Sequence, residues 1–191
     1  MKRKRINIKE ISISNTIIPV WKRFIAYMLD WYIGSMFISL PMVMIYMKTT
    51  NSEDLNVNLF QYPEKYALLA GLLGLIFAFF YYVIVPLIIW KGQTLGKHLC
   101  HFKIVKENGE DIDFKDLFLR QVIGIFLIEG SLISASNLFH QILSIITNIN
   151  LVTPLMYIGI PISILSSVFV LFKKDHKAIH ELIAKTNLKE V

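Results

Sequence analysis

The longest uncharged stretch of the chain constrains its fold more than any other feature. Residues 66–90 contain 25 consecutive residues without Asp, Glu, Lys or Arg. At about 1.5 Å per residue, a helix of that length crosses a hydrocarbon core of about 30 Å. Inside lipid every backbone polar group must be bonded within the segment, which a helix achieves. The sequence therefore predicts a membrane-spanning helix here.

Three further apolar stretches indicate that the chain crosses the membrane several times. Residues 151–172 are also uncharged, and residues 24–47 contain Asp30 as their one charged residue. Residues 117–135 form a weaker stretch that carries Arg120 and Glu129. The chain is 54% apolar and 18% charged, whereas soluble domains average about 45–50% and about 25%. We therefore predict an all-α membrane protein, a bundle of about four transmembrane helices at about 24–47, 66–90, 117–135 and 151–172.

The lysines and arginines predict how this bundle is oriented. Of the 20 in the chain, residues 1–23 hold seven, residues 91–120 hold six and residues 173–191 hold five. The intervening loops, 48–65 and 136–150, hold two and none. Short loops rich in Lys and Arg stay in the cytoplasm. The alternation therefore predicts a multi-pass protein of the cell membrane with both ends cytoplasmic, since three spans would leave five lysines outside.

The third span is less regular than the others. Its uncharged core from Val122 to Ile128 is short, and the sequence after Glu129 mixes polar with apolar residues. We expect residues 137–147 to form either an amphipathic segment at the outer face or the continuation of a buried helix.

The segments outside the spans differ in composition. Residues 1–20 form a basic arm, residues 21–188 the transmembrane domain and residues 189–191 a tail. Between the second and third spans, residues 101–106 have the composition of a strand. Asn108-Gly109 then favours a tight turn, because both residues accept positive φ. Residues 112–114 can return as a second strand, so we predict a short cytoplasmic β-hairpin, with Asp113 capping the next helix.

Asp30 is the charged residue of the first span. A carboxylate inside the membrane costs about 2.5–3.5 kcal/mol even on the lenient insertion scale, so it should be paired, protonated or beside water. Arg23 lies two helical turns earlier on the same face. The candidate partners are Arg23, Lys97, His98 and Arg120. Two interpretations stay open: a proton or cation site, or an ion pair that locks helices together.

Glu129 is the acidic residue of the third predicted span. Arg120 lies nine residues earlier on roughly the same helix face, so the two are a candidate pair. If this span begins near residue 117, Glu129 lies near the middle of the membrane or in its outer half. We therefore group Glu129 with Asp30 and Arg23 as a candidate ion or proton site.

Several patterns resemble sites of known chemistry but lack essential parts. The stretch from Gly92 to Lys97 resembles a phosphate-binding loop, but its glycines are one residue too close and His98 stands where Ser or Thr would bind magnesium. His176 and His180 share a helix face without an evident third zinc ligand. The net charge of +6 fits loops that face anionic lipid. We therefore expect no enzyme, cofactor, metal site or nucleic-acid partner.

Four motifs, in this order and spacing, resemble the RDD family of bacterial membrane proteins. The opening Arg-x-x-Ala-x-x-x-Asp matches at Arg23 and Asp30, and Gly-Gln-Thr-Leu-Gly-Lys matches at residues 92–97. The turn at 108–109 leads into a helix as in the family, and residues 180–186 resemble its closing His-Asp-x-x-Ala-Gly-Thr. This sequence departs from the family there, with Glu181 for Asp and Lys185 for Gly. The motif residues expected at the cytoplasmic face are Gly92, Gln93, Thr94, Gly96, Lys97, Arg120, His180 and Glu181.

The resemblance covers about residues 20–188 and implies a bacterial, multi-spanning protein. Transport has been suggested for the family, including sodium–proton exchange for some members, whereas others resemble small partners of larger membrane machinery. Membership in such a family implies the architecture more than any one activity.

Two functions therefore stay open. In the first, the protein moves a cation in exchange for protons at Asp30, with Arg23 biasing that exchange and Arg120 and Glu181 acting at the cytoplasmic mouth. Four spans are few for a carrier, so a homo-oligomer in the lipid bilayer is expected. In the second, the protein is a non-transporting accessory, assembly or immunity subunit of a larger membrane complex, and the same charges form structural pairs.

Overall fold

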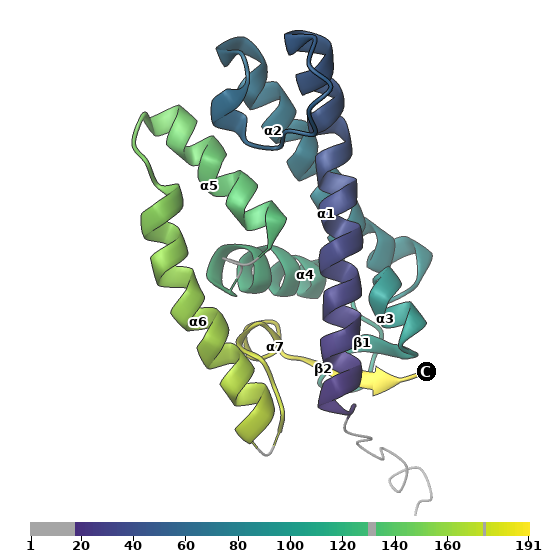
Figure 1. Cartoon of the computed structure of the whole chain (residues 1–191). Helices are drawn as coiled ribbons and strands as arrows, with labels where there is room; N and C mark the ends of the chain where they lie inside the picture. Colours follow the sequence, from purple (N-terminus) through teal and green to yellow (C-terminus); the bar gives the residue numbers. More distant parts are fainter. Residues whose placement is uncertain (1–17, 130–132, 174) are drawn as a thin grey trace, which may run out of the picture.

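Three long helices form the frame of the molecule (Figure 1). The computed structural model describes residues 18–129, 133–173 and 175–191, so almost all of the predicted basic arm lies outside the described residues. The helices are α1 (Val20–Thr50), α2 (Glu64–Phe79) with its π-helical continuation η3 (Phe80–Ile89), and α6 (Val152–Phe172). Each is long and apolar enough to cross a membrane. The predicted class, an all-α membrane protein, is confirmed.

The third predicted span differs from a single straight helix. Helix α4 (Phe114–Leu117) continues as the π-helical η4 (Phe118–Glu129), and this helix lies across the bundle (Figure 1). Helix α5 (Ser134–Thr147) then leaves at 67° to it. Together the bent pair is long and apolar enough to count as a fourth span. How much of the pair lies in lipid stays a prediction.

The short elements gather at the end of the bundle where α1 begins, which we call the tail-side end (Figure 1). They are α3 (Leu95–Leu99), β1 (Phe102–Lys106), α7 (Ile179–Ile183) and β2 (Thr186–Glu190). A further short helix, η2 (Leu59–Gln61), lies in the loop that follows α1. Lys22 near the start of α1 forms an ion pair of 2.7 Å with Glu190 of β2. The beginning of α1 and the end of the chain therefore lie together.

The sheet corrects the predicted hairpin. Strand β1 pairs antiparallel with β2 at the end of the chain, with Phe102 opposite Glu190 and Lys106 opposite Thr186. The turn at Asn108-Gly109 does form, since the Gly109 N–H donates to the Lys106 carbonyl at 2.9 Å. The returning segment, however, makes a single bridge between Val105 and Asp111. Of residues 189–191, predicted as a tail, the first two belong to β2 and the last follows it directly.

Asp113 caps the next helix as the sequence predicts. Its carboxylate accepts the Asp116 N–H at 3.0 Å, which satisfies one of the free donors at the start of α4. Lys106 of β1 forms an ion pair of 2.9 Å with the same carboxylate. The loop is thereby fixed at both of its ends.

The main apolar core lies where α1, α2 and α5 meet. Small residues on α2 allow this close packing: a Cβ at Gly74 would lie 2.7 Å from Leu138 of α5 and 3.0 Å from the sulfur of Met42 of α1. Leu138 and Met42 are both buried. In lipid, where apolar surface gives no driving force between helices, such close backbone approach is a main source of association.

A second apolar core ties the tail-side end together. Phe102 and Ile104 of β1 are buried, and Leu188 of β2 packs against both. Ile18, which precedes α1, belongs to the same cluster of buried apolar side chains as Phe102. The strand from the end of the chain is thus held by burial as well as by backbone hydrogen bonds.

We predict that Phe102→Ala destabilises the folded protein by about 3–5 kcal/mol, because it removes a fully buried aromatic side chain. The measurement is the free energy of unfolding in mixed detergent micelles. The matched control is Phe172→Ala, whose side chain is 82% exposed in the structure. Equal losses for the two variants would contradict this account of the tail-side core.

Candidate functional site

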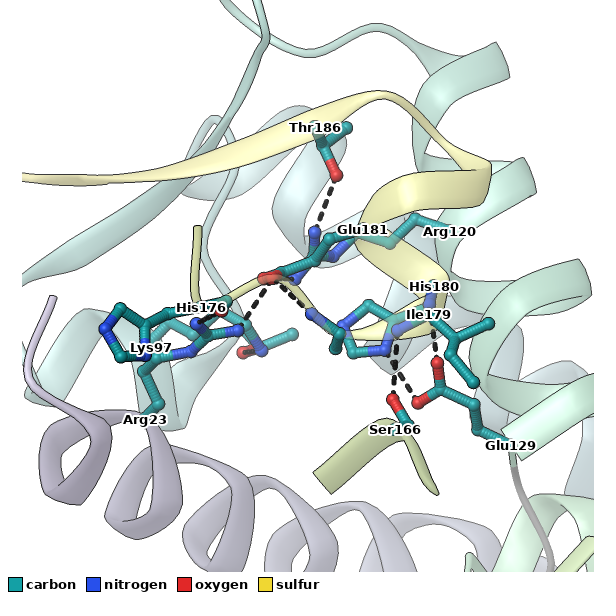
Figure 2. Close-up of polar contacts among 12 residues, drawn as sticks. Arg23, Lys97, Arg120, Glu129, Ser166, His176, Ile179, His180, Glu181 and Thr186 are labelled. Carbon is teal, nitrogen blue, oxygen red and sulfur yellow. Dashed lines mark hydrogen bonds and ion pairs between the residues drawn. The ribbon is translucent and has the colours of Figure 1, made fainter. Parts of the chain in front are cut away.

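Two clusters of polar side chains lie within or beside the apolar bundle. The Asp30 cluster comprises Asp30, Tyr81, Tyr82, Thr94, Gly96 and Lys97. The Glu181 cluster comprises Arg23, Arg120, Glu129, His180, Glu181 and Thr186, most of which are visible in Figure 2. Together they contain all the candidate ion-site residues that the sequence singles out.

The Asp30 carboxylate accepts four hydrogen bonds. Oδ1 accepts from the Tyr81 hydroxyl and from the Gly96 N–H, both at 2.8 Å. Oδ2 accepts from the Thr94 hydroxyl at 2.5 Å and from Lys97 Nζ at 2.9 Å. Asp30 is 4% exposed. A buried carboxylate is tolerated when it is paired and its lone pairs are bonded, and this one meets both conditions.

The Gly-Gln-Thr-Leu-Gly-Lys stretch supplies three of the four donors to this carboxylate. Thr94 is the N-cap of α3, so the Gly96 N–H in the first turn has no partner within the helix and can donate to the carboxylate. A Cβ at Gly96 would lie 2.3 Å from the Ala26 carbonyl oxygen, so glycine is needed for α3 to approach α1 this closely. Gln93 donates to the Phe102 carbonyl at 3.0 Å and thereby ties the stretch to β1.

Two tyrosines also donate hydrogen bonds to Asp30. Tyr81 bonds the carboxylate, and the Tyr82 hydroxyl donates to the Asp30 carbonyl at 2.9 Å. Both belong to the π-helical segment η3. Such segments are rare and often lie at functional sites. Here the segment places two consecutive hydroxyl groups on the same residue of α1.

Glu181 bridges three segments that are far apart in sequence (Figure 2). Its Oε2 is 2.7 Å from Arg23 Nη2 on α1, and its Oε1 is 3.0 Å from Arg120 Nη2 on η4. Arg120 also donates from Nη1 to the Thr186 hydroxyl at 2.7 Å. Both Arg120 and Glu181 are 2% exposed. The bridge holds the end of the chain against the first helix and the crossing helix.

Glu129 contacts the same segment through His180. The His180 N–H donates to Glu129 Oε1 at 2.5 Å, and the ring Nδ1 lies 2.8 Å from Oε2. The crossing helix can come this close because Gly124 leaves room: a Cβ there would lie 2.6 Å from that of His180. Two guanidinium groups and two carboxylates thus balance each other in the Glu181 cluster.

The surroundings shift the pKa values of the two α7 residues. Burial alone would raise the pKa of Glu181, but the attraction of Arg120 and Arg23 outweighs it and lowers the pKa from 4.5 to about 2. Burial, reinforced by the nearby Arg120, lowers the pKa of His180 below 6.5. At neutral pH Glu181 is therefore ionised and His180 is neutral, so the imidazole donates a hydrogen bond from Nδ1 to Glu129.

A cavity of about 510 Å³ adjoins the Asp30 cluster between α1, α2, η4 and α5. Its walls are largely apolar side chains, such as Leu72, Ile125 and Phe139. Asp30 and Lys97 lie at its lining together with Gln121. Asp30 therefore borders a partly open space, and the walls of that space are mostly hydrocarbon.

The structure changes several of the expected pairings. Of the four candidate partners of Asp30, Lys97 makes the ion pair, whereas Arg23 bonds Glu181. Arg120 also bonds Glu181, and Glu129 bonds His180. Because η4 crosses the bundle, Glu129 contacts His180 of α7, and its depth in the membrane stays a prediction. Among the described residues, no group of three or more His, Cys, Asp or Glu could hold a metal ion.

Sequence reasoning missed the tyrosines and Thr186. The adjacent Tyr81 and Tyr82 lie in a run that is otherwise apolar and uncharged from residue 67 to 90. A hydroxyl group in such a place needs a hydrogen-bond partner, and that requirement was an available signal. Thr186 is the last residue of the closing motif, which was its signal, but its bond to Arg120 depends on the fold of the tail.

The architecture and the meeting of these motifs at one end define a helical membrane protein with its chain end clamped to the bundle. The chain belongs to the RDD family: the sequence model of that family matches residues 18–185. It is also similar to the uncharacterized protein YckC of Bacillus subtilis (strain 168), with 28% identity over 103 residues. That match covers 54% of this chain and 56% of the relative, so it spans little more than half of each. No solved structure matches the chain.

We predict that acid weakens the Glu181 cluster in two stages. Folding lowers both pKa values, so the folded state binds fewer protons than the unfolded chain and stability falls as the pH falls. The His180 contribution is lost below pH 6.5 and that of Glu181 between pH 4.5 and about 2. In a thermal melt, the difference in Tm between the protein and Glu181→Gln should therefore shrink as the pH is lowered from 6 to about 3.

Glu107→Gln is the control, because Glu107 is a surface residue paired with Lys177. A Tm difference between the protein and Glu181→Gln that stays constant from pH 6 to 3 would show that ionised Glu181 contributes nothing specific.

Proposed function

We propose that this protein is a non-transporting accessory subunit of a larger complex in the cell membrane. The observation that supports this proposal most is the saturation of Asp30 by four donors from Tyr81, Thr94, Gly96 and Lys97. A cation site needs several oxygen ligands with free lone pairs. Here the ammonium group of Lys97 already occupies the place where a cation would sit, so the carboxylate serves as a structural anchor.

The exposed surface of α6 supports a role in assembly. Only 11% of its most apolar stretch is buried inside the molecule, and its buried residues are Gly159 and Ser166. Tyr157, Ile158 and Ile164 point outward. In lipid such a face is stable without a partner, but it also lets a second membrane helix pack along it. That second helix would belong to another protein or to a second copy of this chain.

The orientation is part of the same proposal. The lysines and arginines concentrate before the first span, in the loop after the second and after the last. The ion pair between Lys22 and Glu190 keeps the start of α1 and the chain end on one side. We propose that this tail-side end faces the cytoplasm, because Lys and Arg in short loops are retained there.

Proton-coupled cation transport is the second candidate. The observation that favours it is the cavity of about 510 Å³ that Asp30 and Lys97 border. In this mechanism Lys97 would move away from Asp30, and the carboxylate would then alternate between a proton and a cation. The change would have to break the bonds from Thr94 and Tyr81 or find substitutes for them.

We predict that the purified protein in liposomes gives no proton flux that depends on Na⁺ or K⁺. The measurement is the response of a pH-sensitive dye trapped in the vesicles after a cation gradient is imposed. Asp30→Asn should lower the Tm and the amount of protein in the membrane, because it breaks a buried ion pair. Asp54→Asn, at an exposed position in the loop after α1, is the matched control.

A cation-dependent proton flux that Asp30→Asn abolishes without lowering the Tm would overturn the accessory role in favour of transport. The assembly face is tested separately, by placing a photo-crosslinking amino acid at Tyr157, which is 70% exposed, in native membranes. An adduct with a membrane protein or a second copy is expected there. If no protein adduct forms at Tyr157 or at neighbouring Ile158, the proposed face is wrong.

A further inference from the structure

The cavity beside Asp30 has the size and the apolar lining of a ligand-binding site, which the accessory role does not use. Its volume of about 510 Å³ lies within the range of about 300–1,000 Å³ typical of small-molecule sites. Its lining on α2 and η3 extends from Leu72 to Val83, about 16 Å along a helix. Phe139 of α5 and Ile125 of η4 close other sides. The space is therefore long and apolar.

One of the residues that line this space carries a buried donor without a partner. Gln121 of η4 lines the cavity and is 5% exposed. Within the part of the chain that the structure describes, its side-chain nitrogen Nε2 has no hydrogen-bond partner. A buried donor left unbonded costs about 1–3 kcal/mol. The position therefore favours a molecule that brings an acceptor oxygen to Gln121.

The charges around the cavity restrict that acceptor. Lys97 and Asp30 neutralise each other at 2.9 Å, so this end of the cavity has no net charge. Lys97 also donates to Thr94 at 3.0 Å, which leaves one of its three N–H groups available. A neutral oxygen such as an ester carbonyl accepts from an amide without upsetting this balance, whereas a carboxylate or phosphate would add uncompensated charge.

Water satisfies these conditions less well than a hydrocarbon chain does. A buried water needs two to four polar partners, and a cavity with apolar walls stays dry. The surrounding solvent is lipid, which carries long apolar chains and ester carbonyls in one molecule. Asp30 lies six residues inside the apolar stretch that begins at Phe24, about 9 Å along the helix. The polar end of the cavity is thus near the membrane boundary.

We propose that the cavity is a binding site for one glycerophospholipid from the tail-side leaflet. One acyl chain fills the space between α2, η4 and α5, and its ester carbonyl accepts a hydrogen bond from the Gln121 amide. The headgroup extends past Lys97 toward the interface. No covalent step is involved, and the lipid is a structural ligand whether or not the protein transports a cation.

The test compares an ester-linked with an ether-linked lipid on the full-length protein. Dioleoyl phosphatidylcholine has ester carbonyls, and its dialkyl ether analogue lacks them but keeps the chains and headgroup. The protein is placed in micelles with equal amounts of the two, and native mass spectrometry counts the molecules retained. One bound lipid is expected, with the ester form preferred by about tenfold, because the ether form leaves the Gln121 donor unbonded.

Two variants locate the preference. Gln121→Leu removes the donor at similar size, so it should retain a lipid but lose the preference for the ester. Val122→Phe fills the cavity and should lose most of the retained lipid, whereas Val168→Phe, the same change at an exposed position on α6, should leave both lipid number and preference unchanged.

Three outcomes would overturn the proposal. The first is equal retention of the ester and ether lipids by the unaltered protein. This measurement does not depend on whether any variant folds. The second is an ester preference that survives Gln121→Leu. The third is displacement of the lipid by inorganic phosphate at millimolar concentration, because the headgroup alone would then be what the protein binds.

Discussion

The bond between Asp30 and the loop after η3 is the contact on which the tail-side end depends. A carboxylate within an apolar helix is destabilising unless an opposite charge pairs with it and its lone pairs accept hydrogen bonds. Lys97 supplies the charge, and Thr94, Gly96 and Tyr81 supply the remaining donors. Because three of the four donors belong to residues 94–97, the loop has to lie against α1. Strand β1 begins five residues after Lys97, so its position follows from the same contact.

The Glu181 cluster extends this arrangement to the end of the chain. Strand β2 pairs with β1, and Glu181 just before it bonds Arg23 and Arg120. A buried carboxylate between two guanidinium groups contributes specificity more than stability, since only one arrangement satisfies all three charges. Glu129 adds a second contact to α7, through hydrogen bonds from the backbone N–H and the neutral imidazole of His180. The two clusters thus fix α1, η4 and α7 with respect to one another, and the apolar cavity borders the first of them at Asp30 and Lys97.

The sequence allowed the spans to be predicted because lipid imposes a simple rule on uncharged runs. Residues 24–47, 66–90 and 151–172 all lie within or close to the bounds of α1, α2 with η3, and α6. The partner of β1 could not be predicted in the same way. The turn at Asn108-Gly109 favoured a local hairpin, but β1 pairs with a strand some 80 residues later in the chain.

The sequence predicted that the buried charges are paired, but it did not predict most of the partners. Helical spacing placed Arg23 on the same face as Asp30, but it carried no information on Glu181, which approaches Arg23 from the other end of the sequence. The prediction of Glu129 near the middle of the membrane or in its outer half assumed an upright helix, and it stays a prediction now that η4 is seen to cross the bundle. The crossing direction of η4 is set by packing against α7 and α6, and no local pattern encodes it.

The central claim is that Asp30 and Lys97 act as one structural unit, and a double-mutant cycle tests it most directly. The free energy of unfolding would be measured in mixed micelles for the protein, Asp30→Asn, Lys97→Met and the double variant. Each single change leaves a buried group without its partner, so the double variant should lose less than the sum of the two, with a coupling of about 2 kcal/mol. Losses that add to within about 0.5 kcal/mol would contradict the account.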